Sequence, residues 1–248
     1  MNKIMLITGA SRGIGAATAR LAASEGYAVC VNYRSNAEHA EHLISDIQAS
    51  GGEAISIRAD ISDEQSVERL FASIDAQLGP ITALVNNAGV LETQTRLENL
   101  SAARLNRIFG TNVIGSILCA REAVRRMSHR HGGHGGAIVN VSSMAARLGS
   151  PNEYIDYAAS KGAIDTLTIG LAREVAADGI RVNAVRPGLI DTDMHASGGE
   201  PGRIERLKGS VPLQRGGTAE EVARAILWLL SDESSYTTGT FIDVSGGR

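Results

Sequence analysis

The stretch TGASRGIG at residues 8–15 separates the first apolar run of the chain, Ile4–Ile7, from the helix-like segment Ile14–Ser24. Glycines at such a turn allow positive φ angles, and their missing side chains let the backbone approach a pyrophosphate at the N-terminus of the helix. The spacing is G-x-x-x-G-x-G and not the G-x-G-x-x-G of the common dinucleotide fingerprint. The turn therefore favours a dinucleotide-binding site directly after the first strand, with an ordinary strand–helix turn as the alternative.

The same turn shares features with motifs of two other enzyme classes. A P-loop requires Gly-Lys-Ser/Thr at the start of the helix, whereas Gly15 is followed by two alanines, which argues against nucleotide triphosphate hydrolysis. Ser11 lies in a G-x-S-x-G pattern, the nucleophile elbow of serine hydrolases. That elbow belongs in the middle of a sheet, and here it follows the first strand. A serine hydrolase that uses Ser11 is therefore the less favoured alternative.

The composition excludes several classes of protein. Of the 248 residues, 43% are hydrophobic, which is enough for one well-packed domain over residues 1–248. The 24 basic and 27 acidic residues leave a formal charge of -3, so no basic field exists to hold nucleic acid. Cys30 and Cys119 both lie in apolar stretches, which argues against a secreted disulfide scaffold. No apolar run reaches the roughly 7–15 residues of a secretory signal or the ~20 of a membrane span, so we expect a cytoplasmic protein.

Short apolar runs alternate with longer amphipathic segments along the chain. This alternation predicts an α/β fold, a single-domain Rossmann-type, doubly wound parallel sheet of about seven strands with helices on both faces. The predicted strands are Lys3–Thr8, Ala28–Asn32, Ala54–Arg58, Ala83–Asn86, Ala137–Val141, Arg181–Arg186 and Thr240–Val244. The predicted helices are Ile14–Ser24, Asn36–Ser50, Ser62–Leu78 with Ser62 as N-cap, Ala103–Arg130, Tyr154–Ala177 and Ala219–Leu230.

Five motifs occur in an order and spacing that resemble those of the short-chain dehydrogenases/reductases, over essentially the whole chain. They are the turn at 8–15, Asn86-Asn87-Ala88-Gly89, Ser143, the pair Tyr157-x-x-x-Lys161, and Pro187-Gly188. Within the family, the chain most resembles bacterial oxidoreductases similar to glucose 1-dehydrogenase and to β-ketoacyl carrier-protein reductases. The resemblance implies reversible hydride transfer between a nicotinamide and an alcohol or carbonyl substrate, with Tyr157 as general acid/base.

Tyr157 and Lys161 are four residues apart on a predicted helix and so lie on one face, about one turn apart. A free phenol has a pKa of about 10, so acid/base work near pH 7 requires a shift of about three units, or ~4 kcal/mol. An ammonium ~6 Å away at an effective dielectric constant of ~20 supplies ~2.8 kcal/mol. We expect Lys161 to lower the pKa of Tyr157, with the cationic oxidised nicotinamide supplying the remainder. A surface Tyr and Lys on an amphipathic helix is the alternative.

The resemblance assigns roles to two further polar residues. Ser143 is expected to bind the substrate oxygen, although it lies one residue further from Tyr157 than is commonest in the family, and Ser142 competes for this role. The extra residue is expected in the loop Ser150–Tyr154, because Pro-Asn tolerates insertion. Asn112 is expected to interrupt its helix and to hold a water that connects Lys161 to solvent, with a satisfied core Asn as the alternative.

The cofactor site is expected at the carboxyl edge of the sheet, where open parallel sheets bind ligands. By resemblance, Asp60 reaches the adenine, and Thr192 holds the carboxamide of the nicotinamide. The full set of expected contacts is Gly9, Ser11, Arg12, Gly13, Ile14, Gly15, Arg34, Asp60, Ile61, Asn86, Ala88, Gly89, Tyr157, Lys161, Pro187, Gly188, Ile190 and Thr192.

The charge after the second strand predicts which nicotinamide cofactor is used. NAD sites place an Asp or Glu about 20 residues beyond the glycine turn, on the ribose 2′-hydroxyl. No acidic residue lies between Gly26 and Asn36, whereas Arg34 occupies the expected position of a 2′-phosphate and Arg12 could face it. Guanidinium groups suit phosphate, so we expect NADP preference, with use of both cofactors as the alternative.

The segment Leu189–Pro212, rich in Gly and polar residues, is expected to form a mobile lid over a small-molecule substrate site. Side chains that could reach its mouth are Glu92, Arg96, Arg147, Glu153, His195, Arg203 and Arg206. The histidines between residues 129 and 134 lack acidic partners, so we expect a solvated loop and no metal site. By resemblance a homotetramer is expected, and a dinucleotide sensor without chemistry is the remaining alternative.

Overall fold

Within residues 3–248, the part of the chain that the computed structural model describes, seven strands form one parallel sheet. Only the main chain of His195 is included in this description. The strand order is β3-β2-β1-β4-β5-β6-β7, so the connections run in opposite directions from β1 and from β4, as predicted for a doubly wound fold. The strands are β1 (Lys3–Ile7), β2 (Tyr27–Tyr33), β3 (Ala54–Arg58), β4 (Ala83–Asn86), β5 (Gly136–Val141), β6 (Ile180–Pro187) and β7 (Phe241–Val244).

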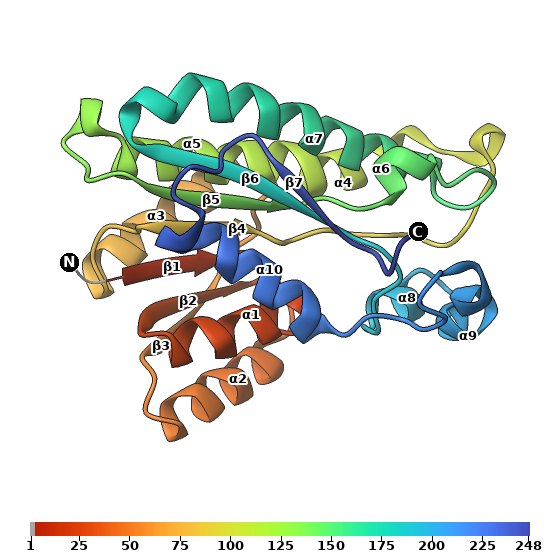
Figure 1. Ribbon diagram of the computed structural model, residues 1–248, viewed down its shortest axis with the longest axis horizontal. Coiled ribbons are helices and arrows are strands. Elements are labelled where there is room, and N and C mark those ends of the chain that lie inside the picture. Colours follow the sequence, from red (N-terminus) through yellow and green to blue (C-terminus); the bar gives the residue numbers. More distant parts are fainter. Residues whose placement is uncertain (1–2) are drawn as a thin grey trace.

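Helices cover both faces of this sheet (Figure 1). Helices α1, α2 and α10 pack on one face and α3, α5 and α7 on the other, while α8 and α9 lie beyond the carboxyl ends of the strands. The helices are α1 (Gly13–Ser24), α2 (Ala37–Ala49), α3 (Glu64–Gln77), α4 (Ala102–Phe109), α5 (Ser116–Met127), α6 (Ala145–Leu148), α7 (Ile155–Val175), α8 (Met194–Ser197), α9 (Arg203–Leu207) and α10 (Ala219–Leu230).

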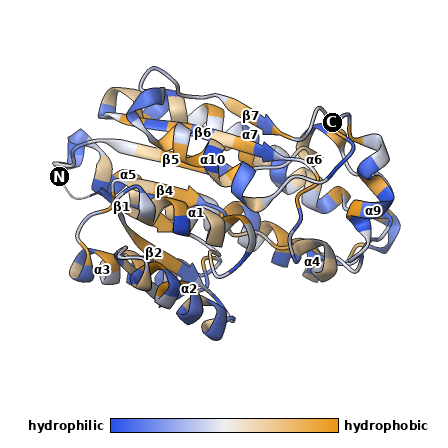
Figure 2. Cartoon of the chain, turned by 60° about the horizontal axis from the view of Figure 1, so that its bottom comes forward, coloured by the Kyte–Doolittle hydropathy of each residue, from blue (hydrophilic) through white to orange (hydrophobic). Residues whose placement is uncertain are grey.

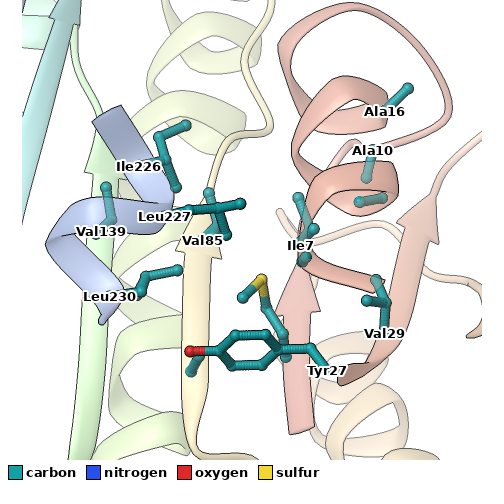
Figure 3. Close-up of a cluster of buried hydrophobic side chains, with 14 of the residues drawn as sticks. Ile7, Ala10, Ala16, Tyr27, Val29, Val85, Val139, Ile226, Leu227 and Leu230 are labelled. Atoms are coloured by element: carbon teal, nitrogen blue, oxygen red, sulfur yellow. The ribbon is translucent and has the colours of Figure 1, made fainter. Parts of the chain in front are cut away.

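The core consists of two apolar layers because side chains along a strand alternate between the faces of the sheet. In β1, Met5 and Ile7 belong to the layer under α1 and α10, whereas Ile4 and Leu6 belong to the layer under α3 and α5. In the first layer, Ile226, Leu227 and Leu230 of α10 lie among the side chains of the central strands, with Val139 and Val85 beside them (Figure 3). Figure 2 shows that hydrophobic residues are concentrated in the strands.

Two predicted helices differ from the observed ones. Helix α3 begins two residues after the predicted start, and its N-cap is Asp63, which accepts a hydrogen bond from the backbone N–H of Gln65, while Ser62 instead donates to Asp60. The predicted helix Ala103–Arg130 is three segments: α4, the π-helical turn η2 (Gly110–Gly115) and α5. Helix α5 ends at Met127 because Ser128 turns into extended backbone and caps the short turn that follows.

The segment Leu189–Pro212 is more ordered than a loop. It contains α8, α9 and a 3₁₀ turn at Lys208–Ser210, none of which was predicted, and its role as a mobile lid stays a prediction. Helix α6 was also not predicted, since four residues are too few for a periodic apolar pattern. Over residues 3–248 no helix is both long and apolar enough to cross a membrane.

Candidate active site

The glycine turn between β1 and α1 is closely packed. Gly9 and Gly13 have φ of +61° and +57°, a region that favours glycine. A Cβ on Gly9 would lie 2.8 Å from Cα of Ala88, and one on Gly15 would lie 2.7 Å from Cα of Ala10. The N-cap residue Arg12 makes no side-chain capping bond, so the first-turn N–H groups of α1 are available to an anion.

Amide side chains at the ends of the neighbouring strands β2 and β4 hold this turn in place. Asn32, at the end of β2, accepts a hydrogen bond from Gly9 N at 3.2 Å through Oδ1. Asn87, just after β4, donates from Nδ2 to the carbonyl oxygens of Thr8 and Gly9 at 2.9 and 3.0 Å. Asn32 is not among the predicted site residues, and the signal that could have found it is a polar residue at the end of an otherwise apolar strand.

Two adjoining cavities, of about 280 and 440 Å³, run along the carboxyl edge of the sheet. The smaller cavity contains, of the predicted cofactor contacts, Gly9, Ser11, Arg12, Gly13, Ile14, Arg34, Asp60, Ile61, Ala88, Gly89 and Thr192. The larger contains Ile14, Ser143, Tyr157, Lys161, Pro187, Gly188, Ile190 and Thr192. Both walls share Ile14, Asn87, Leu91, Thr192 and Met194, so the cavities form one continuous path.

Three predicted site residues lie behind these walls. Gly15 provides the close contact between α1 and the turn. Asn86 is buried and donates to the side-chain oxygen of Asn140 and to the carbonyl oxygen of Ser116. Asn112 is 1% exposed and reaches the cavity wall only through its partners. These residues therefore support the cavity walls without lining the cavities themselves.

The outer end of the smaller cavity carries two arginines. Arg34 lies just after β2, with its Nη1 3.8 Å from an oxygen of Asp60. Arg12 lies 3.9 Å from Asp193. All four side chains are largely exposed, and ion pairs of this kind contribute only about 0–1 kcal/mol. Both guanidinium groups can therefore turn toward a phosphate at little cost.

Ser143, Tyr157 and Lys161 meet in the larger cavity. Tyr157 and Lys161 share one face of α7, as predicted, with Lys161 Nζ 5.6 Å from the centre of the Tyr157 ring. The same Nζ donates to the carbonyl oxygen of Val141, at the end of β5, at 2.7 Å. A side-chain hydrogen bond joins Tyr157 to Ser143. The three groups that the resemblance assigns to chemistry are thus brought together from the turn after β5, which carries Ser143, and from α7, which carries Tyr157 and Lys161.

The pKa values of this pair are dominated by burial. Burial raises the pKa of Tyr157 to about 12, and the hydrogen bond with Ser143 opposes this rise. Burial lowers the pKa of Lys161 to about 8, against the carboxylate of Asp165, which raises it. Among the chain's own groups, burial therefore dominates the pKa of the Tyr157 phenol, and the lowering of this pKa by Lys161 together with the oxidised nicotinamide stays a prediction.

The structure distinguishes the two serines after β5. Ser142 is buried and donates to Oδ1 of Asp165 at 2.6 Å and to the carbonyl oxygen of Lys161 at 3.3 Å, both on α7. Ser143 accepts a hydrogen bond from Ala145 N at 3.1 Å and contacts Tyr157. The hydroxyl of Ser142 is therefore engaged by partners on α7, whereas Ser143 contacts the Tyr157 side chain. The loop where the extra residue was expected has left-handed backbone at Ser150 and Asn152.

Asn112 lies within the π-helical turn η2, so the predicted interruption of the helix is observed. Its Nδ2 donates to the carbonyl oxygen of Val90 at 3.1 Å and to Ser160 Oγ at 3.0 Å, and its Oδ1 accepts from Val90 N at 2.8 Å. A Cβ on Gly89 would lie 3.6 Å from this Oδ1 and 3.5 Å from Lys161 Nζ. Gly89 therefore leaves a narrow space between the asparagine and the lysine.

A buried ion pair at the start of α7 was not predicted. Arg104 of α4 donates from Nε and Nη2 to the carboxylate of Asp156 at 2.6 and 3.3 Å, and from Nη1 to the carbonyl oxygen of Thr93 at 2.6 Å. Asp156 also accepts from the backbone N–H of Tyr157 at 2.9 Å. The pair thus fixes the helical turn that carries Tyr157 to α4 and to the loop after β4.

Ion pairs also hold α9 over the larger cavity. Arg203 bonds Glu153 and Glu200 at 2.5 and 2.9 Å, and Arg206 bonds the same two carboxylates. Tyr154 Oη donates to the carbonyl oxygen of Gly198 at 3.2 Å. This segment is therefore fastened to the loop before α7.

Of the side chains expected at the mouth, Glu153 and Arg203 line the larger cavity. The others have partners elsewhere: Glu92 bonds Arg107, Arg96 bonds Glu98 and Asn152, Arg147 bonds Asp243, and Arg206 belongs to the cluster above. The side chain of His195 lies outside the described part of the chain. Among the described side chains, no hydrogen bond joins Ser11 to a histidine or a carboxylate, as a hydrolase triad would require.

The residues present fit a nicotinamide dinucleotide. The glycine turn and the first turn of α1 suit a pyrophosphate, and a Cβ on Gly13 would lie 3.4 Å from Thr192, so a larger side chain would narrow the passage between the cavities. The path leads from the arginines at its outer end to Tyr157 at its inner end. Its shape and donors match an elongated molecule with a phosphate at one end and a reactive ring at the other.

Comparison with known proteins agrees with this geometry. Residues 9–248 match the family described as Enoyl-(Acyl carrier protein) reductase. An uncharacterized oxidoreductase of Escherichia coli, YgfF, is 63% identical over 99% of both chains. The 3-oxoacyl-(acyl-carrier-protein) reductase FabG of Staphylococcus aureus is 36% identical over 100% of this chain and 98% of its own. A solved structure of a mutant short-chain dehydrogenase/reductase from Serratia marcescens has a TM-score of 0.90 at 33% identity, covering 99% of this chain and 97% of that one. The chain therefore belongs to the short-chain dehydrogenase/reductase family of NAD(P)-dependent oxidoreductases.

Proposed function

We propose that the protein is a cytoplasmic, NADP(H)-preferring oxidoreductase that interconverts a small carbonyl compound and its alcohol, with Tyr157 as general acid/base. The observation that carries this proposal is the placement of Ser143, Tyr157 and Lys161 in one cavity that continues to the glycine turn. A dinucleotide sensor would need the smaller cavity at the glycine turn. It would not need the hydroxyl groups of Ser143 and Tyr157, joined by a hydrogen bond, next to the buried Lys161.

The chain's own residues divide the work of proton transfer. When bound, the reduced nicotinamide supplies the hydride to the carbonyl carbon. The Tyr157 hydroxyl donates its proton to the substrate oxygen, which becomes the alcohol, and Ser143 holds that oxygen by a hydrogen bond. Because burial keeps the phenol protonated at neutral pH, Tyr157 is ready to act as an acid in reduction. Lys161 stabilises the phenolate that remains, and Asn112 holds the water through which the proton is replaced.

The cofactor preference rests on Arg34. No carboxylate occupies the end of β2, and Arg34 lines the cavity next to the turn. We predict that Arg34→Ala lowers kcat/KM for NADPH by about 10- to 100-fold and changes kcat/KM for NADH little, because one charge-assisted bond to phosphate contributes about 1.5–3 kcal/mol. Arg20→Ala is a matched control, since Arg20 pairs with Asp46 on the surface. An unchanged NADPH/NADH ratio in Arg34→Ala would contradict the assignment.

The proposed function is tested by a screen of ketones, aldehydes, sugars and acyl thioesters that follows the absorbance of the reduced cofactor. We expect turnover of at least one carbonyl class by the wild type and its loss in Tyr157→Phe. Cofactor binding without turnover on the whole panel would favour the sensor. Ester hydrolysis that is lost in Ser11→Ala and kept in Tyr157→Phe would favour the hydrolase.

A further inference from the structure

Asp165 lies one turn after Lys161 on α7, and both residues are bound to the end of β5. Lys161 Nζ donates to the carbonyl oxygen of Val141 at 2.7 Å. The next residue, Ser142, is 2% exposed, and its hydroxyl donates to Oδ1 of Asp165 at 2.6 Å and lies 3.3 Å from the carbonyl oxygen of Lys161. The carboxylate of Asp165 is thus fixed close to the end of the strand that the lysine ammonium contacts.

The carboxylate of Asp165 also ends a row of charges that alternate in sign. Arg186 of β6 donates from Nε to Oδ2 of Asp165 at 2.9 Å, and both side chains are 15% exposed. The guanidinium carbon of Arg186 lies 3.8 Å from the centre of the Phe241 ring, and its Nη1 is 3.4 Å from Asp243 of β7. Arg147 pairs with Asp243 at 3.0 Å. Because Asp243 shares the charge of Arg186, this arginine cancels the charge of Asp165 only in part.

The other charged groups near α7 have partners of their own. They are Arg104 of α4 with Asp156, Arg203 with Glu153 at the cavity, and Arg130 with Asp178 at the far end of the helix. Lys161 faces the ring of Tyr157, whose centre lies 5.6 Å from Nζ. Burial lowers the pKa of Lys161 to about 8, and the carboxylate of Asp165 opposes this fall.

We propose that Asp165 is a positioning residue whose carboxylate keeps the buried Lys161 as an ammonium ion. Ser142 and Arg186 hold this carboxylate in place. The inference rests on the proposed function, in which the ammonium stabilises the phenolate of Tyr157. Asp165 does not line either cavity, so it acts through the lysine and not on the substrate or the cofactor.

The protonation of Lys161 can be measured directly because the sequence has three lysines, Lys3, Lys161 and Lys208. We would label lysine with ¹³C at Cε and follow its NMR signals with pH in the whole protein without ligands. The signal that is lost in Lys161→Met identifies Lys161, and the two other lysines serve as references in the same spectrum. The Lys161 signal of the wild type is expected to titrate with a midpoint of about 8.

Asp165→Asn and Arg186→Met break the same ion pair but remove charges of opposite sign. Asp165→Asn is expected to lower the Lys161 midpoint by about one pH unit, the effect of one charge roughly 10 Å away at an effective dielectric constant of ~20. Arg186→Met should raise the midpoint by about half a unit, because the carboxylate then acts on the lysine alone. Asp75→Asn, which breaks a pair with Arg126 on α3, is the matched control and should leave the midpoint unchanged.

A lower midpoint in Asp165→Asn without a lower one in Arg186→Met supports the inference. An unchanged or higher midpoint in Asp165→Asn overturns it. A midpoint that falls in both variants also overturns it, since the lost bonds and not the lost charge would then be the cause. If Asp165→Asn does not fold, a higher midpoint in Arg186→Met supports the inference and any other result overturns it.

The NMR titration does not depend on turnover, so the inference and the proposed function can fail separately. Undiminished turnover in Tyr157→Phe would overturn the proposed function, while the titration would still decide whether Asp165 sets the charge of Lys161. Equal midpoints in the wild type and Asp165→Asn would remove the role of Asp165 and leave the proposed function intact.

Discussion

Lys161 is buried next to the ring of Tyr157. There its charge serves the proposed chemistry but lowers the stability of the folded protein. Its Nζ has the carbonyl oxygen of Val141 as a partner, and burial lowers its pKa from 10.5 to about 8. The folded protein therefore binds a proton at this site less tightly than the unfolded chain does. Below pH 8 both states are protonated and the full cost of burying the charge is present. Between pH 8 and 10.5 the folded state releases the proton first, so that this cost fades as pH rises.

We predict that Lys161→Met lowers kcat/KM by at least 100-fold and at the same time stabilises the protein at pH 7 by about 1–2 kcal/mol. The shift corresponds to a cost on the order of 3 kcal/mol, and the unpaired Val141 carbonyl offsets part of the gain. Urea denaturation at pH 7 and at pH 10 checks the sign, because the gain should shrink at the higher pH. A Lys161→Met variant that is less stable than the wild type at pH 7 would contradict the prediction that the buried charge destabilises the folded protein.

At the same scale, the sequence predicted that the residues proposed to react lie together, but not the residues that support them. Tyr157 and Lys161 could be paired from the sequence because they lie four apart on one helix. The partners of Asn32 and Asn87 could not, since their hydrogen bonds to the glycine turn join residues 23 to 79 positions apart. The burial that raises the pKa of Tyr157 could not be predicted either, because a Coulomb sum from spacing alone omits desolvation, which only the packed structure shows.

Among the elements, α4 and α7 depend on the buried pair Arg104–Asp156. Asp156 has no exposed side-chain surface and Arg104 has 10%. Breaking a buried pair by removing one charge leaves the other without compensation and typically costs 3–5 kcal/mol, whereas replacing both by apolar groups can be neutral.

We therefore predict that Asp156→Asn destabilises the protein by about 3 kcal/mol in urea denaturation. The double variant Arg104→Met/Asp156→Leu should recover a large part of that loss. In both, the turn that carries Tyr157 loses its anchor, so kcat should fall more than the affinity for NADPH. Equal free energies of unfolding for Asp156→Asn and the wild type would mean that the Arg104–Asp156 pair contributes nothing to stability.

The elements themselves were predicted to different extents. Strands such as Ala54–Arg58 and Ala83–Asn86 were predicted to the residue, because buried parallel strands are short apolar runs with clear turns on either side. For the helix expected over Ala103–Arg130, an interruption at Asn112 was predicted but the ends of α4 and α5 were not, since a π-helical turn keeps the apolar pattern of a helix and differs only in its hydrogen bonds. The short helices α6, α8 and α9 are below the length at which periodicity is informative.

For the molecule as a whole, the alternation of elements predicted a parallel sheet with helices on both faces, but the order of its strands required the structure. Its surface retains large apolar side chains outside the core. They include Ile114, Ile117, Ile155, Ile169, Trp228 and Tyr236. Exposed apolar groups on α5, α7 and α10 suit contacts between copies of the chain, and we propose a homotetramer.

Sedimentation equilibrium is expected to give four times the 26.0 kDa mass of the chain. Ile117→Lys, on the exposed face of α5, should reduce the mass, because a charge buried at an interface lacks a partner. Glu220→Lys, at an exposed position at the start of α10, is a control that should leave the mass unchanged. A monomer mass for the wild type at micromolar concentration would reject the tetramer.

The central claim is that the Tyr157 hydroxyl moves the proton in a hydride transfer. The most direct measurement compares Tyr157→Phe with the wild type in kcat for a carbonyl substrate and in the NADPH dissociation constant by fluorescence titration. We predict a loss of about 10²–10⁴ in kcat, the range for a positioned acid/base, with NADPH affinity within about twofold. A kcat within about twofold of the wild type, with NADPH still bound, would contradict the account.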